Sequence, residues 1–205
     1  MAYSDSYSAL ERRFLGPVRG ILLRVYSPIV RFLAWARVTP NTVSASGPAL
    51  GVLFVLTVPR SPRLAFLIWV LSVVVDGFDG ALARYTGRAS SLGAFVDQVC
   101  DHVRETLTVA GLVAVGAIPP FWGSFYPVVY TALNLVLYMC NQHQVPLPVA
   151  VKSWLVLYPA IALFLLTGRS YLNIATPLCV LVMAVVVVQG LIALKPAMDH
   201  TGGPG

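Results

Sequence analysis

Four aspartates in the first half of the chain have the spacing that brings carboxylates together on helices. Asp76 and Asp79 are three residues apart and Asp97 and Asp101 are four apart, so each pair shares one helix face. Carboxylates gathered this closely could not all stay ionised unless something strongly positive lay between them. No cysteine or histidine occupies these positions. The expected ligands are therefore hard oxygens, which suit Mg²⁺ or Mn²⁺ better than zinc.

The chemistry expected of such a cluster is phosphoryl transfer. Two divalent ions held by shared carboxylates clamp the attacking and leaving oxygens of that reaction. Small side chains one helical turn from the aspartates would leave room for a nucleotide against the backbone, and Arg84 is placed to meet a diphosphate. Taken singly, each glycine is better explained by close helix packing, which is common in membranes. The small residues are Gly80, Ala83 and Gly93.

The composition is that of an integral membrane protein. Hydrophobic residues make up 58% of the 205 residues, charged residues only 11%, and the mean hydropathy is +0.79. The net charge is +6, and the arginines concentrated before Val38 predict contact with membrane lipids through anionic headgroups. No motif indicates nucleic-acid binding. The three cysteines fall in apolar segments without metal-like or disulfide-like spacing, which predicts small buried side chains.

Length and periodicity predict one all-α membrane domain over residues 1–205. Residues 8–37 form an amphipathic pattern that favours a helix lying in the headgroup plane, with a cytoplasmic helix packed on its own protein as the alternative. Six transmembrane helices are expected within residues 40–194, each near the ~20 residues that a bilayer requires. Residues 195–205 are expected to form a flexible tail. The expected spans are residues 40–58, 63–84, 92–117, 121–141, 147–167 and 171–194.

The basic residues predict the orientation of this bundle. If the N-terminus is cytoplasmic, the outer side carries only Arg60, Arg63 and Arg169. Every other basic residue falls on the inner side, except Arg104, which lies within a span. This bias predicts a multi-pass protein of the cell membrane with both termini and the acidic cluster facing the cytoplasm.

The aspartates and small residues together resemble the signature of the CDP-alcohol phosphotransferase family. Every signature position matches in type and spacing, and the amphipathic start followed by six spans is also similar. The stretch Thr39-Pro40-Asn41-Thr42-Val43 resembles the opening of the first span in this family, whereas the last three spans show no specific match. The matching residues read Asp76-x2-Asp79-Gly80-x2-Ala83-Arg84-x8-Gly93-x3-Asp97-x3-Asp101.

The resemblance implies an enzyme of phospholipid biosynthesis. It would transfer a substituted phosphate from a CDP-linked donor, such as CDP-diacylglycerol, to the hydroxyl of a small alcohol, and would release CMP. The resemblance also suggests a homodimer. Its cofactors would be two divalent cations, Mg²⁺ or Mn²⁺, with Asp101 as the general base. The implied metal ligands are Asp76, Asp79, Asp97 and Asp101, and the implied CDP site comprises Gly80, Ala83, Arg84 and Gly93.

Two other functions fit part of the pattern. A transporter or ion pathway also uses intramembrane carboxylates, but these aspartates lie at one end of the membrane and the chain shows no internal repeat. A catalytically inactive scaffold is disfavoured because every implied ligand is present. The acceptor stays open among glycerol 3-phosphate, inositol phosphate, serine and neutral headgroup alcohols, and a donor such as CDP-choline stays open too.

The roles of four polar residues outside the motif also stay open. Arg104 and Glu105 fit a structural ion pair as well as they fit an acceptor pocket. Lys152 fits a side chain that snorkels to the interface or one that binds an acceptor phosphate. His143 lies in a polar stretch that is most simply a solvated connection.

Overall fold

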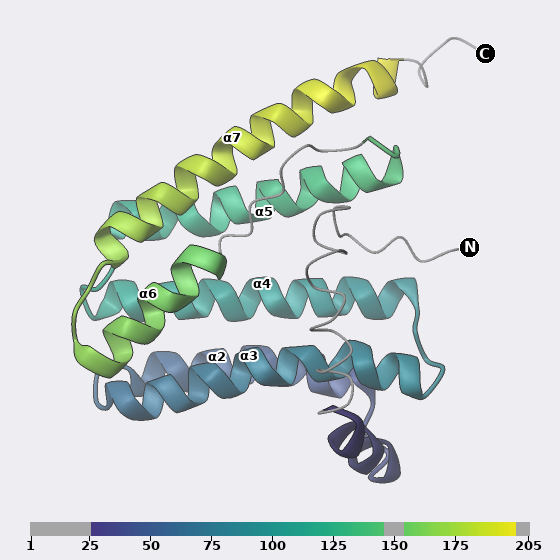
Figure 1. The fold of residues 1–205 in the computed structure, drawn as a ribbon, viewed down its shortest axis with the longest axis horizontal. Coiled ribbons are helices and arrows are strands. Elements are labelled where there is room, and N and C mark those ends of the chain that lie inside the picture. The colour runs from purple at the N-terminus through teal and green to yellow at the C-terminus, as the bar shows by residue number, and fades with distance from the viewer. Residues whose placement is uncertain (1–25, 146–153, 200–205) are drawn as a thin grey trace.

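The computed structural model describes residues 26–145 and 154–199, and these residues are helical apart from short turns. No strand occurs among them, so the predicted all-α class is confirmed. A helix over residues 26–35 comes first, and longer helices follow (Figure 1). Their bounds are α2 Pro40–Thr57, α3 Pro62–Tyr85, α4 Ser91–Ala114, α5 Pro120–Gln142, α6 Trp154–Thr167 and α7 Leu172–Asp199.

Each expected span coincides with one of these helices. For the span expected at 147–167, residues 147–153 lie outside the described part of the chain, and so does Lys152. The helix α7 continues to Asp199, so residues 195–199, which we expected to belong to a flexible tail, are helical. Residues 200–205 lie outside the described residues.

The helices that carry the aspartates begin at side-chain caps. The hydroxyls of Thr39, Ser61 and Ser90 each accept a backbone N–H from three residues further on, at 3.2, 3.4 and 3.0 Å. Such caps satisfy donors that have no partner within the helix. Pro40 and Pro62 occupy first helical positions, where the missing N–H costs nothing. Local sequence therefore fixes where α2, α3 and α4 begin.

A glycine reverses the chain between the two halves of the acidic motif. Gly87 has a φ of +65°, and the backbone N–H of Arg88 bonds to the carbonyl of Ala83 at 2.9 Å, which closes the end of α3. Ser90 then caps α4 a few residues later. The helices α3 and α4 consequently run antiparallel (Figure 1). This brings Asp76 on α3 close to Asp97 and Asp101 on α4.

The helix α2 holds α3 and α4 in register. It packs extensively against both, whereas α3 and α4 touch each other much less. Close approach to α4 depends on Gly51, where an added Cβ would lie 3.0 Å from a methyl of Leu107. In the other half of the bundle, α5 and α6 pack against α7 (Figure 1). The aspartate-bearing helices are thus positioned mainly by a third helix.

The helix over residues 26–35 packs against the part of α3 that carries the motif. The rings of Tyr26 and Phe78 lie 4.6 Å apart, and Val30 is buried in the same cluster. Phe32 and Trp35 point away from the bundle and are exposed. Of the helix expected over residues 8–37, residues 8–25 lie outside the described part. Its location in the headgroup plane stays a prediction.

Three described helices, α3, α5 and α7, are long and apolar enough to cross a membrane. Large apolar side chains on them face outward, among them Leu67, Leu135, Ile174 and Ile192. Soluble monomers rarely expose large contiguous apolar surface, so this arrangement suits lipid. The count of six spans stays a prediction. The helix α4 carries the charged groups Asp97, Asp101, Arg104 and Glu105, which lower its apolar character.

Candidate active site

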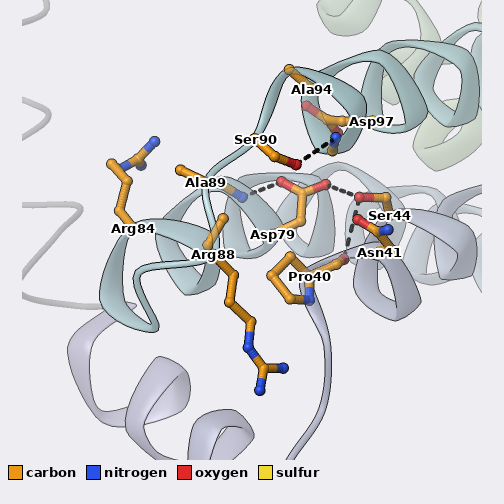
Figure 2. Close-up of a pocket in the computed structure, with 13 residues that line it drawn as sticks. Pro40, Asn41, Ser44, Asp79, Arg84, Arg88, Ala89, Ser90, Ala94 and Asp97 are labelled. Carbon is orange, nitrogen blue, oxygen red and sulfur yellow. Dashed lines mark hydrogen bonds between the residues drawn. The ribbon is translucent and has the colours of Figure 1, made fainter. Parts of the chain in front are cut away.

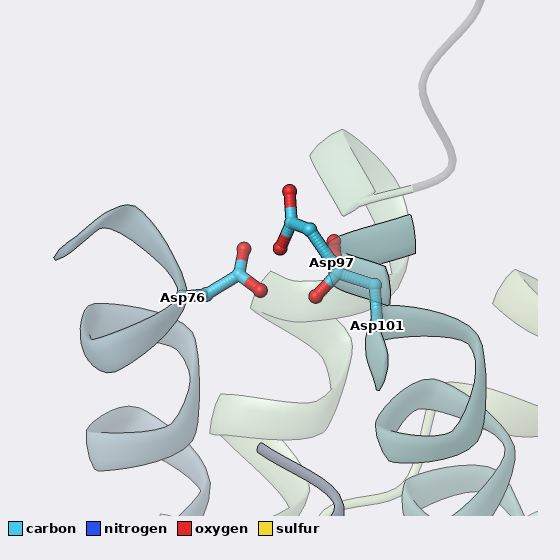
Figure 3. A group of neighbouring side chains, drawn as sticks. All are labelled: Asp76, Asp97 and Asp101. Carbon is cyan, nitrogen blue, oxygen red and sulfur yellow. The ribbon is translucent and has the colours of Figure 1, made fainter. Parts of the chain in front are cut away.

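Three carboxylates gather between α3 and α4. Asp76 on α3 faces Asp97 and Asp101 on α4, and one oxygen from each lies within 4.8 Å of the others (Figure 3). All three side chains are partly buried. A set of carboxylate oxygens without histidine or cysteine is the ligand chemistry of Mg²⁺ and Mn²⁺. The donor set therefore fits a divalent cation.

Asp79 lies beside this triad and is almost fully buried. The hydroxyl of Ser44 on α2 donates to one carboxylate oxygen at 2.7 Å, and the backbone N–H of Gly80 donates to the other (Figure 2). Asp79 and Asp97 line the same cavity. The four predicted aspartates therefore lie close together, with Asp79 outside the triad that Asp76, Asp97 and Asp101 form.

A cavity of about 410 Å³ opens beside Asp79 and Asp97 (Figure 2). All four residues that the family resemblance implies for the CDP site line it. The structure thus brings the implied nucleotide residues and two of the implied metal ligands together at one cavity. The four lining residues are Gly80, Ala83, Arg84 and Gly93.

The glycines of this cavity face polar side chains at its wall. A Cβ added to Gly80 would lie 3.3 Å from a guanidinium nitrogen of Arg84. A Cβ added to Gly93 would lie 3.1 Å from the hydroxyl of Ser90 and 3.7 Å from the amide oxygen of Asn41. Close packing against another helix backbone does not explain these two positions. Room for a ligand explains them better.

Positive charge lies at the rim of the cavity. The exposed side chains of Arg84 and Arg88 both contribute to its lining. Guanidinium groups form paired, charge-assisted hydrogen bonds with phosphate oxygens. The cavity thus offers cations to a diphosphate at its rim and carboxylates for metal ions at its base.

Beneath the carboxylates, two buried charged residues, Arg104 and Glu105, interact with different partners. One guanidinium nitrogen of Arg104 lies 3.6 Å from Asp76 and 3.4 Å from Asp101. Glu105 instead accepts hydrogen bonds from the hydroxyls of Tyr126 at 3.0 Å and Tyr158 at 3.1 Å. Among the described residues the close ion pairs of Arg104 are therefore with Asp76 and Asp101, and Glu105 acts on it only as a nearby charge.

The sequence did not identify Ser44 and Arg88 as residues of the site. Ser44 lies three positions after Asn41, so helical spacing on α2 could have placed both on the cavity side. Arg88 entered the sequence argument only as a charge that sets orientation. His143 caps the C-terminal end of α5 and does not line the cavity.

A model of the CDP-alcohol phosphatidyltransferase family matches residues 37–194. The chain is 32% identical over 121 residues to a phosphatidylinositol phosphate synthase of Mycobacteroides abscessus, covering 58% of this chain and 54% of that protein. It is 33% identical over 97 residues to an archaetidylinositol phosphate synthase of Aeropyrum pernix, covering 47% and 50%. The chain therefore spans about half the length of the curated relatives that it matches.

The fold is similar to that of the Mycobacterium tuberculosis phosphatidylinositol phosphate synthase. The crystal structure of that protein with manganese and citrate matches with a TM-score of 0.66 and 19% identity, covering 83% of this chain and 88% of the other. Its structure with CDP-DAG bound matches with a TM-score of 0.65, again at 19% identity, covering 83% and 94%. At this identity the similarity shows a shared fold.

Proposed function

The chain belongs to the CDP-alcohol phosphatidyltransferase family, and from that membership we propose a membrane enzyme of phospholipid synthesis. It transfers the substituted phosphate of a CDP-linked lipid to the hydroxyl of an alcohol and releases CMP. One observation carries this proposal. Asp97 belongs both to the carboxylate triad and to the cavity lined by Gly80, Arg84 and Gly93. A nucleotide in the cavity would therefore have its diphosphate beside the carboxylates.

We propose CDP-diacylglycerol as the donor and inositol phosphate as the acceptor. Two relatives are named for inositol phosphate lipids, one phosphatidyl and one archaetidyl. A protein of the same fold was solved with CDP-DAG bound. Glycerol 3-phosphate, serine and neutral alcohols are the competing acceptors.

Asp76, Asp79, Asp97 and Asp101 are proposed to hold two divalent cations, with Mg²⁺ as the natural ion and Mn²⁺ as a working substitute. The support is the triad of Asp76, Asp97 and Asp101, with Asp79 beside Asp97 at the same cavity, and the manganese in a protein of the same fold. When bound, such ions would neutralise the diphosphate and stabilise the charge that develops on the leaving phosphate. Ser44 orients the carboxylate of Asp79 from outside the metal ligands.

Asp101 is proposed to act as the general base. It lies deeper than Asp97 on α4, and the neighbouring Arg104 restrains its carboxylate. The acceptor hydroxyl gives its proton to Asp101 while its oxygen forms a bond to the phosphorus that carries the lipid. The bond from that phosphorus to the oxygen bridging it to CMP breaks, and CMP leaves with the electron pair. Arg84 and Arg88 at the rim bind the diphosphate and hold the donor in place.

We also propose that the site faces the cytoplasm and that the protein is a homodimer. The orientation follows from the arginine bias, which puts Arg84 and Arg88 on the inner side. The rim of the cavity carries the same two arginines, so a water-soluble acceptor would enter from that side. The dimer rests on the family resemblance.

Acceptor-dependent CMP release tests this function. The purified chain in lipid nanodiscs would receive CDP-diacylglycerol and Mg²⁺, together with inositol phosphate, glycerol 3-phosphate, serine or inositol in separate reactions. We expect CMP only with inositol phosphate. Release with another acceptor would replace the proposed acceptor and keep the reaction. No release with any acceptor, together with cation flux in proteoliposomes, would favour the transporter.

A further inference from the structure

A buried arginine bridges the two halves of the acidic motif. A single guanidinium nitrogen of Arg104 lies 3.6 Å from Asp76 on α3 and 3.4 Å from Asp101 on α4. Arg104 is only 5% exposed. Because arginine stays protonated in proteins, this is a permanent positive charge next to the carboxylates.

The fold builds this charge into place. The stem of Arg104 runs along α2 at Gly47, where an added Cβ would lie 3.6 Å from its Cδ. Its Nε and Nη1 atoms are buried and make no hydrogen bond of good geometry within the described part of the chain, although the hydroxyl of Tyr158 lies close to the guanidinium. Buried polar atoms in native structures are usually satisfied, and each exception calls for an explanation. A guanidinium whose hydrogen bonds are this incomplete is better explained by its charge than by its hydrogen bonds.

The charge alters the balance of the site. Four carboxylates carry four negative charges, and two divalent cations would cancel them completely. Arg104 adds one positive charge to this balance, and Glu105 next to it is common to the wild type and to every variant of Arg104. The added charge repels the divalent ions and attracts an anionic diphosphate.

We propose that Arg104 is a charge-setting residue of the site, which weakens the binding of divalent ions to the empty carboxylates and strengthens the binding of the donor's diphosphate to the ion-loaded site. This inference rests on the proposed function. In this proposal Arg104 acts through its charge, and not only by holding α3 and α4 together. Loss of a brace would weaken the binding of both ligands, whereas loss of the charge shifts the two affinities in opposite directions.

Three substitutions separate charge from structure. Arg104→Lys keeps the charge, Arg104→Gln keeps some hydrogen-bond donors without the charge, and Arg104→Met keeps only the apolar stem. Glu105 and its two tyrosines are unchanged in all three, so their contribution cancels. Thr108→Val is the matched control, because Thr108 is equally buried one turn deeper on α4 and its hydroxyl bonds to a backbone carbonyl.

The affinity for Mn²⁺ without donor would be measured by electron paramagnetic resonance of the free ion, in nanodiscs free of anionic lipid. The affinity for CDP-diacylglycerol would then be measured at saturating Mn²⁺ without acceptor. A unit charge several ångströms from a divalent ion changes affinity by about tenfold even at the dielectric of bulk water, and by more in a partly buried site, so tenfold is a lower bound. We expect the Gln and Met variants to bind Mn²⁺ at least about tenfold more tightly and the donor at least roughly threefold more weakly. The Lys and Thr108→Val variants should stay within about threefold of the wild type on both measures.

Several results would overturn the proposal. Weaker binding of both ligands by the Gln and Met variants would identify Arg104 as a structural brace, and a Lys variant that matched Met would exclude the charge as the cause. Unchanged affinities for both ligands in the Arg104→Gln and Arg104→Met variants would also exclude the charge as the cause. If the wild type failed to bind the donor at any Mn²⁺ concentration, the proposed function would fail instead. The measured affinities for Mn²⁺ would still show whether Arg104 weakens the binding of divalent ions.

Discussion

Removal of one hydroxyl should weaken the metal site without touching any proposed ligand. Ser44 on α2 donates to Asp79 on α3 at 2.7 Å, and both residues are less than a tenth exposed. The substitution Ser44→Ala removes this donor and leaves Asp79 with the backbone N–H of Gly80. The carboxylate then loses the side-chain contact that fixes its orientation.

The structure sets the expected size of this loss. An O–H···O⁻ hydrogen bond of this length is charge-assisted, and bonds to charged groups contribute about 1.5–3 kcal/mol. At about 1.4 kcal/mol for each factor of ten, that range corresponds to roughly 10- to 150-fold. Groups that orient metal ligands typically change metal affinity by about 10- to 100-fold when removed. We therefore expect Ser44→Ala to bind Mn²⁺ about 10- to 100-fold more weakly.

Titration of Mn²⁺ against the purified variant, followed by electron paramagnetic resonance, measures this directly. Ser46→Ala is the matched control, since Ser46 lies on the same helix and its hydroxyl bonds only to the carbonyl of Val43, at 2.6 Å. The control should keep the affinity of the wild type. The reasoning is refuted if Ser44→Ala keeps wild-type affinity, or if Ser46→Ala loses as much.

Three further predictions concern the same site. Asp101→Asn should lower kcat by about 10²–10⁴, because it removes the proposed proton acceptor, and should weaken donor binding much less than it lowers turnover. Asp76→Asn should weaken both, and equal loss of donor binding in the two variants would contradict the separate roles. Excess chelator should abolish CMP release and added Mg²⁺ or Mn²⁺ should restore it, so activity that persists in chelator would exclude the metal account. A single cysteine at the exposed position Ala89, in a chain whose native cysteines are replaced, should react with a membrane-impermeant thiol reagent only from the cytoplasmic side; labelling of intact cells from outside would reverse the proposed orientation.

Local sequence signals were sufficient to predict most of the architecture. Apolar stretches, prolines at helix starts and the glycine at position 87 predicted most of the boundaries of the described helices to within a few residues, because caps and turns depend on neighbouring residues. The end of α7 was misjudged. Lys195 and Pro196 suggested the start of a tail, but the helix continues to Asp199, since a polar composition does not by itself end a helix.

The details of the site depended on packing that the sequence does not encode locally. Helical spacing put Asp76 and Asp79 on one face, yet the structure turns Asp76 toward α4 and Asp79 toward Ser44 on α2. The different directions of Asp76 and Asp79 depend on how α2 packs against α3 and α4. The same packing brings Arg104 beneath the carboxylates, whereas the sequence left open an ion pair with Glu105 or a place in an acceptor pocket. Long-range contacts of this kind need the fold.

Transfer of the acceptor's own oxygen to the donor phosphorus is the most direct test of the proposed reaction. Inositol phosphate labelled with ¹⁸O at its reacting hydroxyl would be incubated with CDP-diacylglycerol, Mg²⁺ and the purified chain, and all products would be analysed by mass spectrometry. The account predicts equal amounts of CMP and a new phospholipid, with the label only in the lipid. Label in CMP, or hydrolysis of the donor without a new phospholipid, would contradict it.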